Sequence, residues 1–156
     1  MSEATDRIVA AVRDLPYARY LGVEVVFNGD EMTAVLAFQD HLIGNPVLPA
    51  IHGGVLGAFM EITALAQLSA LQPAQRLPRT IDISIEYLRS GRPLTTYARA
   101  QVKKVGRRVS NVHVEAWQEQ RDAPIAFLRG HFLVDPQDSG CGPLQPQQSG
   151  GFVAPA

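Results

Sequence analysis

The chain has 156 residues, a length that suits one globular domain with a single hydrophobic core. Its 46% apolar and 19% charged residues and its net charge of −1 exclude a broad basic field, so neither nucleic acid nor a membrane surface is an expected partner. One cysteine, Cys141, excludes an intramolecular disulfide, and the lack of a signal-peptide region or a bilayer-length apolar run predicts a cytoplasmic location.

The N-terminal part of the chain predicts a helix followed by a β-hairpin. Residues 3–14 place apolar side chains at helical spacing behind acidic residues, which suit a helix start. Pro16 ends or redirects this helix. Two β-rich runs then follow, 23–27 and 32–38, and the Asn-Gly-Asp sequence at 28–30 indicates the turn between them.

A long apolar helix forms the middle of the chain. Glycine and prolines in residues 39–51 argue against regular structure there and predict a shaped loop. Residues 53–71 then have apolar side chains around almost the whole helix circumference, which indicates a helix buried on most sides. The helix opens on Gly53 and Gly54, and one carboxylate, Glu61, lies about two turns inside it.

The C-terminal half predicts four more strands and then a tail. Short links between the strands suit antiparallel neighbours, so we expect an α+β domain in which an antiparallel sheet curls around the helix of residues 53–71. Proline, glycine, glutamine and serine dominate from Pro136, which predicts one domain over 1–135 and a disordered tail over 136–156. The expected strands are 80–88, with Ile81, Ile83, Ile85 and Tyr87 on one face, followed by 95–105, 109–118 and 125–134.

These features together match one family pattern. The residues that carry the match are Asn45, Ile51-His52-Gly53-Gly54, Glu61, the strand from Thr80 to Arg89, and Gly106-Arg107-Arg108. Over roughly residues 15–135 the chain resembles the hotdog-fold thioesterases, and most closely the phenylacetate-degradation (PaaI-like) subfamily. The resemblance implies a hotdog fold and the hydrolysis of an aryl- or acyl-coenzyme A thioester, or of a carrier-protein thioester. It also implies that no metal or separate cofactor takes part, because coenzyme A is part of the substrate.

The resemblance also implies roles for single residues. Gly53 would offer its backbone N–H to the thioester carbonyl oxygen, with His52 beside it. Glu61 would act as general base or nucleophile. Asn45 would help to hold the attacking water, and Thr80 would form a hydrogen bond near that water or the acid.

Further residues would bind the substrate. Gly54 removes a side chain from the path of the acyl group. The coenzyme A phosphates would meet Arg89 and the turn formed by Gly106, Arg107 and Arg108. We expect the walls of the acyl pocket to include Val47, Leu48, Phe59, Met60 and Tyr87.

Spacing along the helix predicts a site shared between two chains. Glu61 follows Gly53 by eight residues, which is about 12 Å along the axis, so one helix cannot bring both groups to one carbonyl. Two antiparallel helices from different copies would bring them together. We therefore expect a homodimer with two equivalent sites, or a dimer of such dimers.

Simpler interpretations also fit parts of the pattern. Glu61 could be a buried acid whose partner is Thr63 or Thr80. The glycine pair could serve only the geometry of the helix start, and Arg107-Arg108 could form a solvated turn. At the level of the whole protein, the alternatives are a non-catalytic acyl-coenzyme A binding module and a hotdog hydratase or dehydratase.

Overall fold

The computed structural model describes residues 2–71 and 77–134. The predicted tail of residues 136–156, with Cys141, lies outside the described residues. In chain order the elements are α1 (Glu3–Asp14), α2 (Pro16–Leu21), β1 (Val23–Asn28), β2 (Glu31–Leu36), the 3-10 turn η1 (Asp40–Leu42), β3 (Ile43–Asn45), β4 (Ala50–Ile51), α3 (Gly53–Ser69), β5 (Arg79–Tyr87), β6 (Thr96–Val105), β7 (Val109–Trp117) and β8 (Ala126–Leu133).

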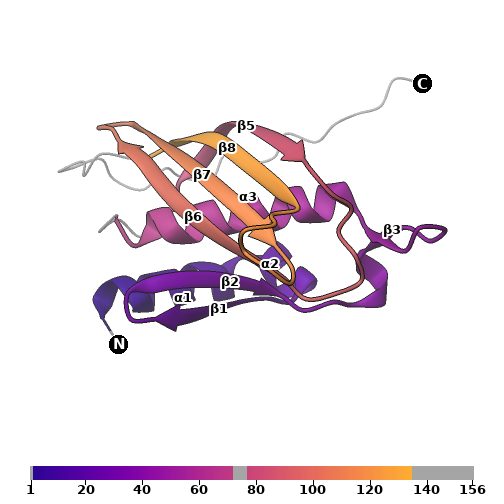
Figure 1. Ribbon diagram of the computed structural model, residues 1–156. Helices are drawn as coiled ribbons and strands as arrows, with labels where there is room; N and C mark the ends of the chain where they lie inside the picture. The colour runs from indigo at the N-terminus through magenta and orange to yellow at the C-terminus, as the bar shows by residue number, and fades with distance from the viewer. Residues whose placement is uncertain (1, 72–76, 135–156) are drawn as a thin grey trace, which may run out of the picture.

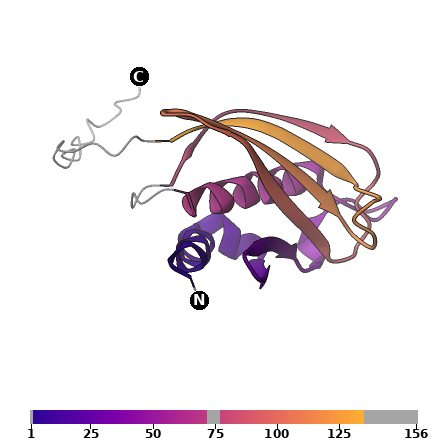
Figure 2. The same cartoon turned by 60° about the vertical axis from the view of Figure 1, so that its left-hand side comes forward.

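Six strands form one antiparallel sheet that curves over α3 (Figures 1 and 2). The strand order is β1-β2-β6-β7-β8-β5, and every pair of neighbours is antiparallel. β5 follows α3 in the chain and takes the edge position next to β8. This arrangement confirms the predicted α+β class, with a curved antiparallel sheet around a central helix.

The hydrophobic core surrounds α3, as its apolar circumference predicts. One side of the helix packs against the sheet, and the other side packs against α1 (Figure 2). Arg7 of α1 donates a hydrogen bond to the Ala70 carbonyl at 3.4 Å, where a cation also complements the C-terminal end of the α3 dipole. The largest side chains with no exposed surface include Phe59, Met60 and Phe132.

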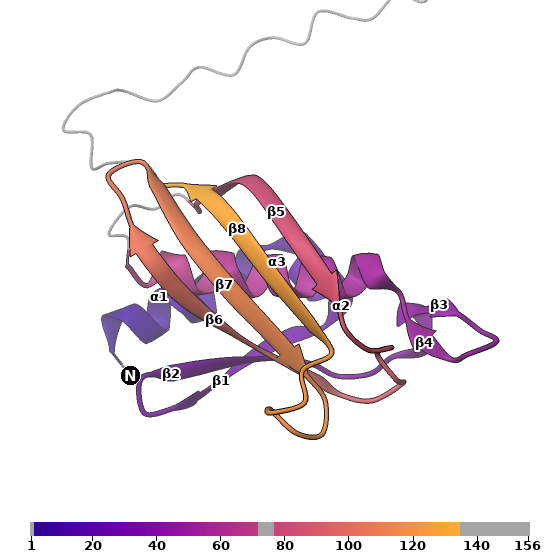
Figure 3. The same cartoon turned by 45° about the horizontal axis from the view of Figure 1, so that its top comes forward.

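Two local predictions for the N-terminal half were incomplete or wrong. Pro16 redirects the chain, but it does so as the first residue of a second helix, α2, a position where a missing N–H costs nothing. Residues 39–51 contain the turn η1 and the two-stranded ribbon β3–β4, where no regular structure was expected. The prolines lie in the connection between the two strands, so they do not interrupt the ribbon pairing. The ribbon projects from the body beside the start of α3 (Figure 3).

Strand β5 departs from the predicted alternation at one residue. Its pairing with β8 shifts between Thr80 and Asp82, so Ile81 is an extra residue and 53% of it is exposed. The alternation in the sequence predicts Ile81 and Ile83 on one face, and this prediction is wrong for Ile81. Instead Thr80 turns its hydroxyl toward α3, where it bonds a helix side chain.

One buried hydroxyl gives a stability prediction. Ser110 of β7 has no exposed surface, and its Oγ has no hydrogen-bond partner within the described ranges 2–71 and 77–134. A buried hydroxyl without a partner costs about 1–3 kcal/mol, so Ser110→Ala should leave the free energy of unfolding unchanged or raise it by about 1 kcal/mol. Urea denaturation measures this change.

A reverse substitution on the same strand provides the control. Ala116 is also fully buried on β7, and Ala116→Ser would place a hydroxyl among apolar atoms. We expect it to lower the free energy of unfolding by about 1–2 kcal/mol. A loss of stability in Ser110→Ala would contradict the prediction, because it would mean that the native hydroxyl is satisfied.

Candidate active site

The start of α3 is held by side chain and backbone contacts around His52. His52 is the N-cap residue, and its Nδ1 accepts a hydrogen bond from the Gly54 N–H at 2.9 Å. An accepting ring nitrogen carries no proton, so the ring proton of His52 is on Nε2. Gly44 of the β3–β4 ribbon leaves room for this side chain, because a Cβ at position 44 would lie 2.7 Å from His52.

The Gly53 N–H is a free donor at this helix start. The N–H groups at the start of a helix lack partners inside it. Here Gly54 donates to His52 Nδ1 and Val55 to the His52 carbonyl, and the first regular helical bond runs from the Leu56 N–H to the same carbonyl. Within residues 2–71 and 77–134, the Gly53 N–H has no acceptor. The positive end of the helix dipole adds to its attraction for a partial negative charge.

Glu61 and Thr80 form the second part of the predicted site. The Thr80 hydroxyl donates a hydrogen bond to Glu61 Oε1 at 2.5 Å, which joins the middle of α3 to the start of β5. Glu61 is half-buried, so its carboxylate is neither fully solvated nor enclosed in the core. One oxygen is engaged by Thr80, which leaves the other to accept a proton or a further hydrogen bond.

The two parts of the site lie at different positions along α3. Gly53 is at the helix start beside Tyr87, whose hydroxyl donates to the Gly53 carbonyl at 2.6 Å. Glu61 is about 12 Å farther along the axis by the helical rise, beside Thr80. The protomer thus brings Glu61 together with Thr80, and His52 together with Gly53 and Gly54. It does not bring these two groups to one point.

Asn45 shapes the tip of the β3–β4 ribbon. Its Oδ1 accepts hydrogen bonds from the N–H groups of Val47 at 3.0 Å and Leu48 at 3.2 Å. This turn presents both apolar side chains to solvent, with exposed fractions of 86% for Val47 and 68% for Leu48. The predicted role of Asn45 in holding water would therefore fall to its amide NH₂, because its oxygen is engaged by the backbone.

Of the other predicted pocket residues, some are exposed and some belong to the core. Tyr87 is 52% exposed, whereas Phe59 and Met60 have no exposed surface in the protomer. Phe59 therefore lies behind the surface of any pocket that one protomer could form. The sequence places Tyr87 in the pocket wall but does not predict its hydrogen bond to Gly53, because that contact joins residues 34 positions apart.

The predicted phosphate-binding residues lie at opposite ends of the sheet. Arg89 follows β5 at the Tyr87 end and donates to the Pro124 carbonyl at 3.4 Å. The turn from Gly106 to Arg108 joins β6 and β7 at the end where β5 begins. One protomer therefore does not gather these groups into one site.

The turn between β6 and β7 has a structural requirement of its own. The Gly106 N–H donates to the Val109 carbonyl at 3.0 Å, and a Cβ at position 106 would lie 2.3 Å from that oxygen. Gly106 thus closes the hairpin and has no N–H left for a phosphate. Arg107 is exposed and lines a hollow of about 520 Å³ together with Lys104, so two cationic side chains do gather at this turn.

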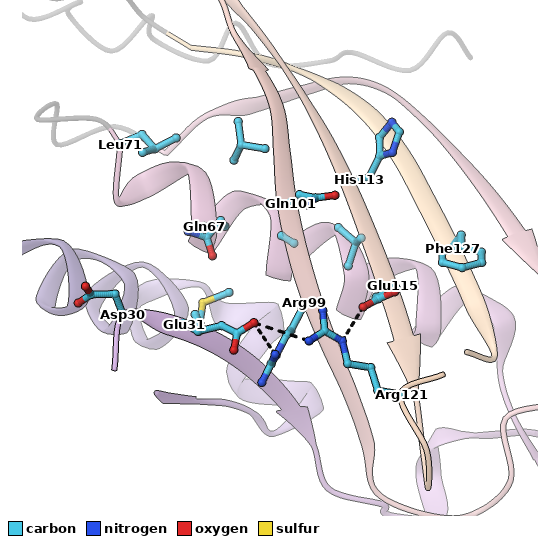
Figure 4. A pocket seen from close by; sticks show the side chains of 14 residues that line it. Asp30, Glu31, Gln67, Leu71, Arg99, Gln101, His113, Glu115, Arg121 and Phe127 are labelled. Atoms are coloured by element: carbon cyan, nitrogen blue, oxygen red, sulfur yellow. Dashed lines mark hydrogen bonds and ion pairs between the residues drawn. The ribbon is translucent and has the colours of Figure 1, made fainter. Parts of the chain in front are cut away.

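A larger crevice of about 700 Å³ lies where β2 and β6 diverge (Figure 4). Besides Asp30, the charged side chains that line it are paired with one another: Glu31 forms ion pairs with Arg99 and Arg121, and Arg121 also pairs with Glu115. The two guanidinium groups lie over the ring of Trp117, at 5.8 and 5.4 Å from its centroid. This network stabilises the outer face of the sheet and leaves no unpaired charge among these groups for a ligand.

One histidine of the crevice has a shifted pKa. Burial, followed by the positive charges of Lys103 and Arg129, lowers the pKa of His113 from its ordinary value. His113 therefore resists protonation and adds no positive charge to the crevice near neutral pH. Across residues 2–71 and 77–134, no three His, Cys, Asp or Glu side chains are grouped as a metal site, and no helix is long and apolar enough to cross a membrane.

Comparisons with known proteins identify the family of this chain. Residues 48–125 match the model of the thioesterase superfamily. The chain is 30% identical over 125 residues to YigI, a medium/long-chain acyl-CoA thioesterase of Escherichia coli K12, and the alignment covers 70% of this chain and 80% of YigI.

Solved structures show the same architecture. A crystal structure from Chromobacterium violaceum is 33% identical, with a TM-score of 0.68, and the match covers 88% of this chain and 100% of that one. PaaI of Escherichia coli, from the phenylacetic acid degradation operon, is 20% identical with a TM-score of 0.72, over 83% of this chain and 91% of PaaI. The chain therefore belongs to the thioesterase superfamily, and it is a thioester hydrolase with the hotdog fold.

Proposed function

We propose that this thioester hydrolase acts on aryl- or acyl-coenzyme A without a metal, at a site formed across a homodimer interface. The observation that carries the proposal is the division of the site along α3: a free N–H donor at Gly53, and a carboxylate held by Thr80 at Glu61. The N–H of Gly53 can stabilise charge on the carbonyl oxygen, and the carboxylate of Glu61 can activate water or attack the thioester carbon. Similarity to YigI supports coenzyme A thioesters as the substrate class.

The reaction assigns a role to each group. Attack on the thioester carbon moves negative charge onto the carbonyl oxygen, which the Gly53 N–H and the His52 Nε2–H stabilise as hydrogen-bond donors. Glu61 takes the proton of the attacking water, or attacks the carbon itself, and Thr80 orients its carboxylate. In the general-base route the C–S bond then breaks, and the thiolate of coenzyme A leaves and takes up the proton that Glu61 holds. In the nucleophile route the thiolate leaves and takes up a proton from solvent, and water then hydrolyses the anhydride between Glu61 and the acyl group, which releases the acid and restores the carboxylate.

The free edge of β5 supports the dimer. Among the described residues, β5 pairs only with β8, and its other edge has no partner strand. Ile81 and Tyr87 of this strand and Leu88 directly after it are about half exposed, which favours coverage by another chain. A second copy paired antiparallel along this edge would form an isologous interface and one continuous sheet.

The same pairing would complete the site. In an antiparallel pair, the Thr80 end of one β5 lies beside the Tyr87 end of the other. Because Thr80 holds Glu61 and Tyr87 holds Gly53, the acid of one subunit would approach the helix start of its partner. The cationic turn at Arg107 and the Arg89 of the other subunit would then lie at one end of the sheet, where the coenzyme A phosphates would bind.

A thioester panel tests the proposed substrate class. Phenylacetyl-, benzoyl-, hexanoyl-, decanoyl- and palmitoyl-coenzyme A are incubated with the purified protein in the presence of a chelator, and free thiol is measured. We expect turnover of at least one member, unchanged by the chelator. Saturable binding with no thiol release across the panel would favour the binding-module alternative and would overturn the proposal.

A further inference from the structure

We propose that Tyr87 is a positioning residue for the start of α3: its hydroxyl holds the peptide between Gly53 and Gly54, so that the Gly53 N–H keeps one direction. The inference rests on the proposed function, in which that N–H binds the thioester carbonyl oxygen. The Tyr87 hydroxyl donates to the Gly53 carbonyl at 2.6 Å, from the end of β5 to the start of the helix.

The same peptide is also held from its other side. The Gly54 N–H donates to His52 Nδ1 at 2.9 Å. Because a peptide group is planar, hydrogen bonds at both its oxygen and its nitrogen fix the orientation of the whole plane. This plane directly follows Gly53, so Tyr87 and His52 together restrict the ψ angle of Gly53.

Backbone contacts hold the neighbouring peptides. The His52 N–H donates to the Leu42 carbonyl at 2.9 Å, and the His52 carbonyl accepts from the Val55 N–H at 3.0 Å. The plane that carries the Gly53 N–H is thus fixed through its carbonyl, while the N–H itself stays free. A donor fixed in advance stabilises developing charge without a cost of reorganisation during the reaction.

The close approach of Tyr87 depends on glycine at position 53. A Cβ at that position would lie 3.2 Å from Tyr87 Cζ, closer than ordinary packing allows. Glycine at position 53 therefore leaves room for the Tyr87 ring as well as for the substrate. Tyr87 is also 52% exposed, so the wall role that the sequence predicts and the positioning role require separate tests.

Tyr87→Phe separates the two roles because it removes the hydroxyl and keeps the ring. We expect kcat to fall about tenfold, which corresponds to about 1.4 kcal/mol, while KM for the same acyl-coenzyme A changes less than about twofold. The matched control is Tyr97→Phe: Tyr97 stacks on Trp117 at 6.0 Å on the outer face of the sheet, and its loss of a hydroxyl should leave both constants unchanged.

Amide hydrogen exchange provides a readout that does not depend on turnover. Without the Tyr87 hydroxyl, the first turn of α3 should open more often, so the Gly54 amide should exchange several-fold faster in Tyr87→Phe than in the wild type. Circular dichroism of both tyrosine variants checks that each one folds.

Each outcome bears on one of the two proposals. A higher KM with unchanged kcat in Tyr87→Phe would limit Tyr87 to the pocket wall and overturn the positioning role. Unchanged kcat and KM would also overturn the positioning role. If the wild type hydrolyses no thioester, the proposed function fails, and the exchange experiment alone decides about Tyr87. Unchanged Gly54 exchange in Tyr87→Phe would then show that the hydroxyl does not hold this turn.

Discussion

Glu61→Gln should lower kcat for acyl-coenzyme A hydrolysis by about 10³-fold, the size of effect expected when a general base or nucleophile is removed. An amide neither takes a proton from water nor attacks a thioester. Its carbonyl oxygen can still accept the hydrogen bond of the Thr80 hydroxyl, so the contact between α3 and β5 should survive. Steady-state thiol release measures the effect, and thermal unfolding checks that the fold is kept.

The control for this prediction is another acid of the same sheet edge. Glu86 of β5 is exposed and forms an ion pair with Arg129 at 2.8 Å on the outer face of the sheet. Glu86→Gln should leave kcat within about twofold of wild type, because an exposed ion pair contributes little energy. Retention of more than about a tenth of wild-type kcat by Glu61→Gln would contradict the assigned role of Glu61.

Gly53→Pro should lower kcat by about 10²-fold, because it removes the N–H that is proposed to stabilise the oxyanion. The backbone accommodates this change. Position 53 is the first residue of α3, where proline is favoured, and φ of −59° and ψ of 131° at His52 suit a residue before proline. The substitution thus removes a donor and leaves the helix start in place.

Gly53→Ala is the matched control, because it retains the N–H and adds a Cβ with the same contact to Tyr87. That contact of 3.2 Å requires only a small shift of the tyrosine ring, so we expect kcat to fall by less than about tenfold. Equal losses in the alanine and proline variants would show that crowding of Tyr87 causes the effect. They would exclude the N–H as its source.

Co-expression of Glu61→Gln and Gly53→Pro tests whether the site is shared between subunits. Random assembly in equal amounts makes half of the pairs mixed, and each mixed pair contains one site with both wild-type groups, so we expect about a quarter of wild-type activity. Each variant expressed alone, and the two mixed after assembly without exchange, should show only the residual activity of the single variants. A site within one subunit would give no recovery, since no chain then carries both groups.

The sequence predicts the central helix and its candidate site residues because they depend on local patterns. An all-apolar helix, a glycine pair at its start and a carboxylate inside it are all visible in residues 53–71. The pairing of Glu61 with Thr80 also agrees with the sequence, which offers Thr80 as a partner for the acid.

Features that depend on contacts distant in sequence were missed or misread. Nothing local indicates that the Tyr87 hydroxyl meets the Gly53 carbonyl, because helix packing against the sheet decides it. Prolines and glycine in residues 39–51 predict a loop, because strands as short as β3 and β4 give no alternation signal in the sequence. Strand alternation predicts Ile81 with Ile83, but the irregularity at Ile81 depends on the register with β8, which the chain itself does not display.

The extra residue in β5 decides whether Thr80 and Tyr87 point to the same side of the strand. Thr80 and Tyr87 are seven positions apart, and an odd separation in a regular strand would point their side chains to opposite sides. The irregularity at Ile81 absorbs one position, so both hydroxyls reach α3. The number of residues in β5 is therefore more constrained than the identity of residue 81. Many side chains can occupy this extra position, but deletion of the residue would remove the hydrogen bond to α3 from either Thr80 or Tyr87.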